Sequence, residues 1–248
     1  MKFTLVATVA ALTLGQALAG TAAADAAIRQ ERIQFAQGAS TAVVKGRLQG
    51  DAMVDYTVRG AAGQTLTVAL RKTHAQNYFN VLPPGSTTTA MFVGDSGENY
   101  SGRLAADGDY TIRVYLMRPA ARRNETSDYT LTIGATGEAL PPLPASQDAL
   151  LPGTSYHASA KIRCVPAYES AARECDAFVV RRGFDGTATV DVPGSADRRS
   201  ILFVAGKPVA SNAAAMDVLA SERQGDVTIV KLGESERYEI PDALLTGG

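Results

Sequence analysis

Residues and motifs that mark enzymes are scarce in this chain of 248 residues. It has only two histidines, His74 and His157, and it contains no G-x-S-x-G, H-E-x-x-H, P-loop or G-x-G-x-x-G sequence. A Ser-His-Asp triad, a zinc peptidase site and the common nucleotide-binding loops each need one of these features. We therefore predict a protein that is not an enzyme and that needs no cofactor.

An excess of charge of either sign is also missing. The 24 basic residues are balanced by 25 acidic residues, and the net charge is −1. A chain with so little net charge has no overall field that would attract nucleic acid or an anionic membrane surface. We predict no nucleic-acid partner, and any electrostatic contribution to binding must come from a local group of charges.

Long apolar runs are absent beyond the first residues of the chain. Lys2 precedes an apolar run from Phe3 to Leu14, and small residues follow it. This order is typical of a secretory signal peptide, which we assign to residues 1–24 with cleavage after Ala19 or Ala24. The run is too short to span a bilayer, and no cysteine follows it that could carry a lipid anchor. We predict a periplasmic or secreted protein without an integral membrane segment in its mature form.

Only two cysteines are present, Cys164 and Cys175, and both follow the signal peptide. In an oxidising compartment such a pair forms a disulfide by default. Zinc binding is the alternative, but C-x10-C does not have the spacing of zinc ligands, and His157 is the only histidine nearby. We predict the disulfide and no metal site.

Carboxylates gather in two turns, with Asp95 and Glu98 in "GDSGEN" and with Asp107 and Asp109 in "ADGDY". Turns rich in oxygen ligands can bind calcium. The twelve-residue pattern of a calcium loop is absent, however, and Asp and Gly are the residues that turns use in any case. We interpret these carboxylates as turn formers.

Most of the chain alternates short apolar runs with turns of Gly, Pro, Asn and Asp. From residue 31 onward, seven or eight strand-sized pieces recur at intervals of roughly eight to twelve residues, and helical periodicity is almost absent. Tyr110, Ile112 and Val114 fall at period two, which is typical of a strand with one buried face. The pattern predicts an all-β fold with an antiparallel, jelly-roll-like β-sandwich over residues 25–134.

A change of composition follows this segment. Residues 135–155 contain four prolines and no strand alternation, so we predict a semi-extended linker that leaves the angle between two domains free. Residues 156–248 predict a small β-rich domain of five to seven strands that contains both cysteines. Its helix content should be slight, with one turn near "SNAAAMDVLA".

A group of arginines interrupts the alternation after Leu116. Arg118, Arg122 and Arg123 lie within six positions, in a segment that we expect to be a solvent-exposed loop. Guanidinium groups bind carboxylates or phosphates through paired hydrogen bonds, and loops on a rigid sandwich often carry binding groups. Two interpretations stay open: a loop that binds a partner, and a solvated cluster paired with Glu125 and Asp128.

The motifs of the first domain resemble those of the periplasmic inhibitors of goose-type lysozyme over about residues 31–134. The resemblance rests on "KGRLQG", "DYTVRGAAGQTLTV", "YFNVLPPG", "LAADGDYTIRVYLMR" and "ARRNETSDYTLTI". The specific features are an arginine at the end of the long strand, a second arginine four residues later, an Asn shortly after it and a Tyr in the final strand. The C-terminal domain resembles an uncharacterised domain of exported bacterial proteins.

The resemblance implies a sandwich that inserts a basic loop into the acidic substrate cleft of a goose-type lysozyme and that performs no catalysis. It assigns partner binding to Arg118, Arg122 and Asn124. The sequence departs from the family at two points, because an acid, Asp51, stands near the place of a loop aromatic, and because the last hundred residues lie outside the single-domain pattern. The alternative function is a non-catalytic module that binds a cell-envelope glycan, such as peptidoglycan, or a protein.

Overall fold

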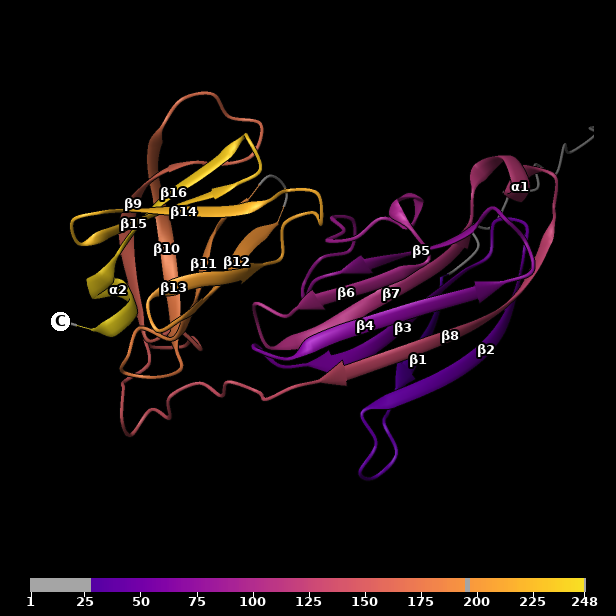
Figure 1. The fold of residues 1–248 in the computed structure, drawn as a ribbon, viewed down its shortest axis with the longest axis horizontal. Coiled ribbons are helices and arrows are strands. Elements are labelled where there is room, and N and C mark those ends of the chain that lie inside the picture. The colour runs from indigo at the N-terminus through magenta and orange to yellow at the C-terminus, as the bar shows by residue number, and fades with distance from the viewer. Residues whose placement is uncertain (1–27, 195–196, 248) are drawn as a thin grey trace, which may run out of the picture.

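The computed structural model describes residues 28–194 and 197–247, and within these ranges the chain is built almost entirely from β-strands (Figure 1). They form two four-stranded sheets and one eight-stranded sheet. The all-β class predicted from the sequence is therefore confirmed. The predicted signal peptide, residues 1–24, lies outside the described residues. Within the described ranges, no helix is long and apolar enough to cross a membrane.

The first unit is a sandwich of two four-stranded sheets, with the strand orders β1-β3-β7-β5 and β2-β8-β4-β6. Its strands are β1 (Arg29–Ile33), β2 (Thr41–Gln49), β3 (Met53–Gly60), β4 (Thr65–Lys72), β5 (Asn77–Leu82), β6 (Asn99–Arg103), β7 (Gly108–Leu116) and β8 (Thr126–Thr136). A 3₁₀ turn, η1 (Gly94–Ser96), precedes β6, and a short helix, α1 (Arg118–Arg122), joins β7 to β8. The helix α1 therefore connects one sheet to the other.

The core of this unit follows from the period-two pattern of its strands. Tyr110, Ile112 and Val114 on β7 are buried, as are Leu131 and Ile133 on β8, and side chains of both sheets pack in one apolar cluster. Burying a side chain of this size contributes about 1.5–3 kcal/mol to stability. A rigid double layer of sheets consequently supports the connection that carries the arginines.

The second unit is a single eight-stranded sheet with the order β13-β12-β11-β10-β9-β16-β15-β14. Its strands are β9 (Ala158–Val165), β10 (Arg173–Arg181), β11 (Ala188–Pro193), β12 (Arg198–Val204), β13 (Lys207–Ser211), β14 (Leu219–Gln224), β15 (Val227–Leu232) and β16 (Glu236–Pro241), and α2 (Asp242–Thr246) follows them. The prediction of five to seven strands was too low. The helical turn predicted near "SNAAAMDVLA" was wrong, because residues 212–218 form a non-helical connection from β13 to β14.

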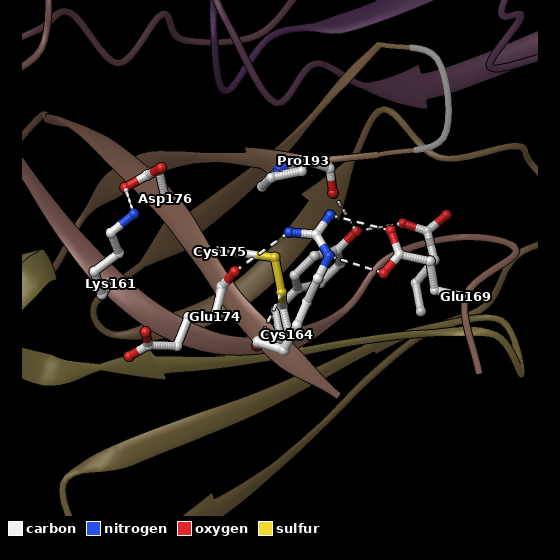
Figure 2. Close-up of a disulfide and its surroundings, with 10 residues drawn as sticks. Lys161, Cys164, Glu169, Glu174, Cys175, Asp176 and Pro193 are labelled. Atoms are coloured by element: carbon white, nitrogen blue, oxygen red, sulfur yellow. Dashed lines mark hydrogen bonds and ion pairs between the residues drawn. A yellow bond between two sulfur atoms is a disulfide. The ribbon is translucent and has the colours of Figure 1, made fainter. Parts of the chain in front are cut away.

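The predicted disulfide is present between Cys164 on β9 and Cys175 on β10 (Figure 2). The two Cα atoms are 6.0 Å apart, and both side chains are buried in the core of the second unit. The bond closes the connection between these two strands at its base. Arg173, the first residue of β10, binds both carboxylate oxygens of Glu169, which lies in that connection, at 2.8 and 3.0 Å.

The Pro-rich segment between β8 and β9 makes backbone contacts with both units. The N–H of Leu140 donates to the carbonyl of Ala62 at 2.9 Å, and the N–H of Leu143 donates to the carbonyl of Arg181 at 2.8 Å. Nε2 of the buried His157 lies 3.0 Å from the carbonyl oxygen of Leu143. The structure thus differs from the expectation of a freely hinged linker, because tertiary hydrogen bonds hold the segment where its sequence offers no strand pattern.

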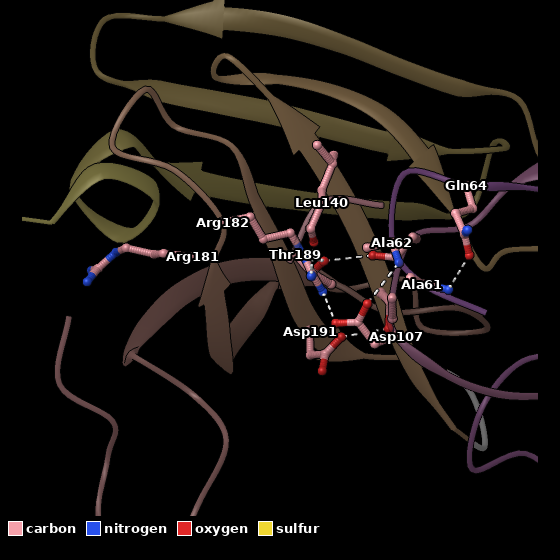
Figure 3. Close-up of polar contacts among 12 residues, drawn as sticks. Ala61, Ala62, Gln64, Asp107, Leu140, Arg181, Arg182, Thr189 and Asp191 are labelled. Carbon is pink, nitrogen blue, oxygen red and sulfur yellow. Dashed lines mark hydrogen bonds and ion pairs between the residues drawn. The ribbon is translucent and has the colours of Figure 1, made fainter. Parts of the chain in front are cut away.

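Direct contacts also join the two units (Figure 3). Nη2 of Arg182 lies 2.8 Å from Asp107 of the first unit, and the Arg182 side chain is only 1% exposed. The hydroxyl of Thr189 donates to the carbonyl of Ala105 at 2.7 Å. A small apolar cluster completes the contact and contains Ala62, Ala105, Leu202 and Ala210. Polar and apolar contacts therefore both hold the units together.

Candidate functional site

The interruption after β7 is a helix and not the predicted loop. Pro119 stands in the first turn of α1, where its fixed φ suits a helix and its missing N–H costs no hydrogen bond. Ala120 is fully buried and anchors the helix on the sandwich core. Arg118 and Arg122 are four residues apart, a spacing that places both side chains on one side of a helix. Both are exposed.

Asn124 stabilises the turn that leads from α1 into β8. Its φ is +54°, in the left-handed region that Asn tolerates better than most residues. The side-chain oxygen of Asn124 lies against Gly50, where a Cβ atom would approach it to 2.7 Å. Gly50 also has a positive φ of +59°, and its N–H donates to the carbonyl of Glu125 at 3.0 Å. The turn after β2 thus supports the end of α1.

One hollow of about 430 Å³ is lined by all three residues that the sequence resemblance assigned to partner binding, namely Arg118, Arg122 and Asn124. Gly50 and Asp51 line the same hollow. It combines two guanidinium groups, an amide and one carboxylate, and it is open to solvent. This set can bind an anion with planar geometry, such as a carboxylate.

The three arginines differ in whether a neighbouring carboxylate of the same chain binds them. Nε of Arg123 lies 2.6 Å from Glu125, which also accepts a contact from Nε2 of His74 at 2.9 Å. Hydrogen bonding to Arg123, with the charges of Arg123 and His74, lowers the pKa of Glu125 from its ordinary value. Among residues 28–194 and 197–247, no carboxylate lies within ion-pair distance of Arg118 or Arg122. The charges of these two guanidinium groups are therefore not neutralised by any carboxylate of the described residues.

The open alternative of a self-paired cluster therefore applies to Arg123 alone. Asp128, the other proposed partner, is bound by Arg47 through two contacts of 2.7 Å. Hydrogen bonding to Arg47 lowers the pKa of Asp128. Both acids near the arginine group are neutralised by cations other than Arg118 and Arg122.

Sequence reasoning missed the part played by His74. Its Nδ1 accepts the N–H of Gln76 at 3.1 Å, which leaves the Nε2 side of the ring to face Glu125. The connection from β4 to β5 is fixed further by Thr73, whose hydroxyl accepts the N–H of Asp128 at 2.9 Å. His74 precedes Glu125 by about fifty residues, so no local pattern could have linked them.

The acidic turns are engaged in ion pairs. Asp107 pairs with Arg182, Asp109 with Arg32 at 3.0 Å, and Glu98 with Lys72 at 3.3 Å. Within the described part of the chain, no three His, Cys, Asp or Glu side chains are grouped so that they could hold a metal ion.

No family model matches the chain. The inhibitor of g-type lysozyme from Escherichia coli K12 is 28% identical over 116 residues, which are 46% of this chain and 86% of that protein. The crystal structure of PliG from Aeromonas hydrophila, a periplasmic inhibitor of g-type lysozyme, is 36% identical and covers 44% of this chain and 97% of its own, with a TM-score of 0.42. Over that part of its length, the chain is homologous to periplasmic inhibitors of g-type lysozyme.

A second solved member of the inhibitor family, a mutant of the Escherichia coli protein, is 26% identical and covers 44% of this chain and all of its own, with a TM-score of 0.35. More than half of this chain therefore has no counterpart in the named relatives. Those relatives are inhibitors and not enzymes.

Proposed function

We propose that this protein is an exported inhibitor of a g-type lysozyme that acts in the periplasm. It binds the enzyme through the surface of α1, with Arg118, Arg122 and Asn124 as the contact residues. The observation that carries the proposal is the pair of uncommitted guanidinium groups at one hollow, in a chain that is homologous to lysozyme inhibitors.

The mechanism is occlusion of the substrate cleft. A glycosidase keeps carboxylic groups in its cleft for acid and base chemistry. A guanidinium group can bind such a carboxylate through two parallel hydrogen bonds, and the coupling is strong where water is excluded. Arg118 and Arg122 entering the cleft would deny the glycan access to the catalytic acid. The inhibitor supplies no reacting group.

The rigidity of the site favours tight binding. The buried Ala120 anchors α1, and Gly50, Glu125 and His74 hold the residues that follow it. Side chains and loops that are already ordered lose little conformational entropy on association. Asp51 lines the same hollow and would repel a carboxylate placed opposite it. It therefore discriminates between lysozymes by the charge at that position of their clefts.

The proposal is tested by titrating the mature protein against a g-type lysozyme, with a small soluble oligosaccharide as substrate. We expect stoichiometric inhibition at micromolar concentration or below. Absence of inhibition at micromolar concentration by protein that is folded in its circular dichroism spectrum would reject the proposal.

A further inference from the structure

A second cationic hollow lies on the outer face of the β2-β8-β4-β6 sheet. Its volume is about 450 Å³, within the usual range of ligand pockets. Lys45 on β2 is paired in register with Thr130 on β8, and Thr130 is paired with Arg71 on β4. Residues opposite each other across an antiparallel ladder point to the same face. Lys45 and Arg71 therefore flank a hydroxyl, with their backbones roughly 10 Å apart.

The other charged groups at this hollow are already bound within the protein. Asp128 is held by Arg47, and Lys72 contacts Glu98 at 3.3 Å and donates to the carbonyl of Asn77 at 2.8 Å. Among the residues that the structure describes, Lys45 and Arg71 have no acidic partner within ion-pair distance. The face thus carries two exposed positive charges that the fold does not neutralise.

Tyr129 and Gly46 also line the hollow, and they are paired in register across β8 and β2. The Tyr129 ring faces the core, where its hydroxyl lies 2.8 Å from that of Tyr56. The surface open to a ligand is therefore made by the outward residues. Farther along the same face, the outward residues of β4 and β8 are small and largely hydroxylated, namely Thr65, Thr67, Ala69 and Thr132.

We propose that this hollow binds a carboxylate-bearing glycan, and specifically a peptidoglycan strand. The guanidinium of Arg71 and the ammonium of Lys45 suit the carboxylates, and the threonine hydroxyls can both donate to and accept from sugar hydroxyls. A protein partner fits less well, because the centre of the hollow offers no protruding aromatic or large aliphatic anchor of the kind that dominates protein interfaces. The site would hold the inhibitor on the polymer that the enzyme attacks, and it does not depend on lysozyme inhibition being correct.

The test measures cosedimentation of the mature, full-length protein with purified peptidoglycan sacculi, and calorimetric binding of soluble muropeptides. Neutral chitin oligosaccharides serve as a ligand without carboxylates. Lys45→Ala and Arg71→Ala should each weaken peptidoglycan binding about fivefold, as expected for a partly solvated charged contact, and Arg71→Lys should recover part of the loss. Neither side chain is buried, so folding should be unaffected.

Two control variants remove the same charge elsewhere. Arg59→Ala changes an exposed arginine of β3 on the other sheet, and Lys161→Ala changes an exposed lysine of the second unit that pairs with Asp176. Both should bind sacculi as the parent does. All variants are also titrated against a g-type lysozyme with the soluble substrate, where Lys45→Ala and Arg71→Ala should inhibit normally.

Three results would overturn the proposal. The parent could fail to bind sacculi and muropeptides, or the two hollow variants could bind as well as the controls. In the third result, Lys45→Ala and Arg71→Ala weaken inhibition of the enzyme and leave glycan binding intact, which would assign these cations to the protein partner. Loss of lysozyme inhibition by the parent alone would reject the proposed function and leave the glycan site standing.

Discussion

At the scale of single residues, three arginines that lie within six positions have different surroundings. Arg123 is held by Glu125, whereas Arg118 and Arg122 face an open hollow without an acidic partner among the described residues. All three side chains are exposed, so exposure does not distinguish them. What separates them is whether a carboxylate of the same chain already satisfies the guanidinium, and this makes Arg123 an internal control.

We expect Arg118→Ala or Arg122→Ala to weaken binding to a g-type lysozyme by about 2–5 kcal/mol. The reason is that a carboxylate of the lysozyme, buried in the complex, would be left without its guanidinium partner. Arg→Lys should recover only part of this loss, since an ammonium group cannot make the planar two-point contact. Arg123→Ala should cost under about 1 kcal/mol, as for a charge at the rim. Inhibition titrations at fixed ionic strength measure all of these, and equal small effects at the three positions would contradict the assignment.

Acid should loosen the ion pairs that surround α1. The pKa of Glu125 is lowered mainly by Arg123, and the pKa of Asp128 is lowered by Arg47. A carboxylate with a lowered pKa stabilises the fold above its unfolded-state pKa, near 4, and this contribution disappears as the pH falls through the folded-state pKa. We expect the Tm to be level from about pH 7 to about pH 5 and to fall below about pH 4.

Asp128→Asn isolates one of these pairs. The variant removes the titrating group but keeps the side-chain shape, so its Tm should fall less steeply than that of the parent between about pH 4 and pH 2.5. Thermal melts followed by circular dichroism give these slopes, and identical slopes for Asp128→Asn and the parent would count against a stabilising pair.

At the scale of elements, the disulfide is the covalent restraint on the second unit. It joins β9 to β10 at the base of their connection, and both sulfur-bearing side chains are buried. Closing a loop of this length restricts the unfolded chain, in a model where the stabilisation is mainly entropic. The bond therefore ties together the two ends of the connection.

Cys164→Ser should lower the free energy of unfolding of the second unit by about 2–4 kcal/mol. The variant also exposes Cys175 as a free thiol, which a thiol reagent detects after denaturation. Denaturant melts followed by tyrosine fluorescence measure the change. A parent protein that shows two reactive thiols when denatured without reductant would contradict the expectation, as would a variant that unfolds like the parent.

At the scale of the whole molecule, a buried guanidinium couples the two units. The side chain of Arg182 is 1% exposed and contacts Asp107, Thr189 and the carbonyl of Leu140. Asp107 also accepts the N–H of Ala62 at 3.0 Å, so its carboxylate ties a turn of the first unit to the second unit. Removing one partner of such a pair leaves the other charge buried and unsatisfied.

Asp107→Ala should weaken the contact between the units by an amount near the lower end of about 3–5 kcal/mol, because Asp107 itself is partly solvated. We expect calorimetry to resolve two transitions in this variant and limited proteolysis to cut faster between residues 144 and 155. Asp109→Ala, two residues away, removes an exposed pair with Arg32 and should cost under about 1 kcal/mol. Equal behaviour of the two variants would show that the Arg182 contact does not couple the units.

The amino-acid sequence by itself determined the strand pattern and the disulfide. Tyr110, Ile112 and Val114 alternate because a strand turns successive side chains to opposite faces, and this rule needs no knowledge of distant residues. The cysteines were equally predictable, because no other thiol competes for them. The arginine group was visible as a break in the same local pattern, but its short helix was not, because five residues carry too little periodicity to identify a helix.

Only the tertiary structure decided which charged side chains form ion pairs within the protein. The sequence predicts an ordinary turn residue at Asp107, but in the structure Asp107 forms an ion pair with Arg182, which lies 75 positions later. Glu125 and Asp128 look in the sequence like partners for all the nearby arginines, but of these only Arg123 binds one of them. His74, in the connection from β4 to β5, and Arg47 on β2 supply the other contacts. Ion pairs depend on the positions of side chains in space, and periodicity along the chain contains no information about partners that the fold brings from another strand or another unit. For this reason the sequence could point to Arg118 and Arg122, but only the folded chain shows that the described carboxylates near them pair with other cations.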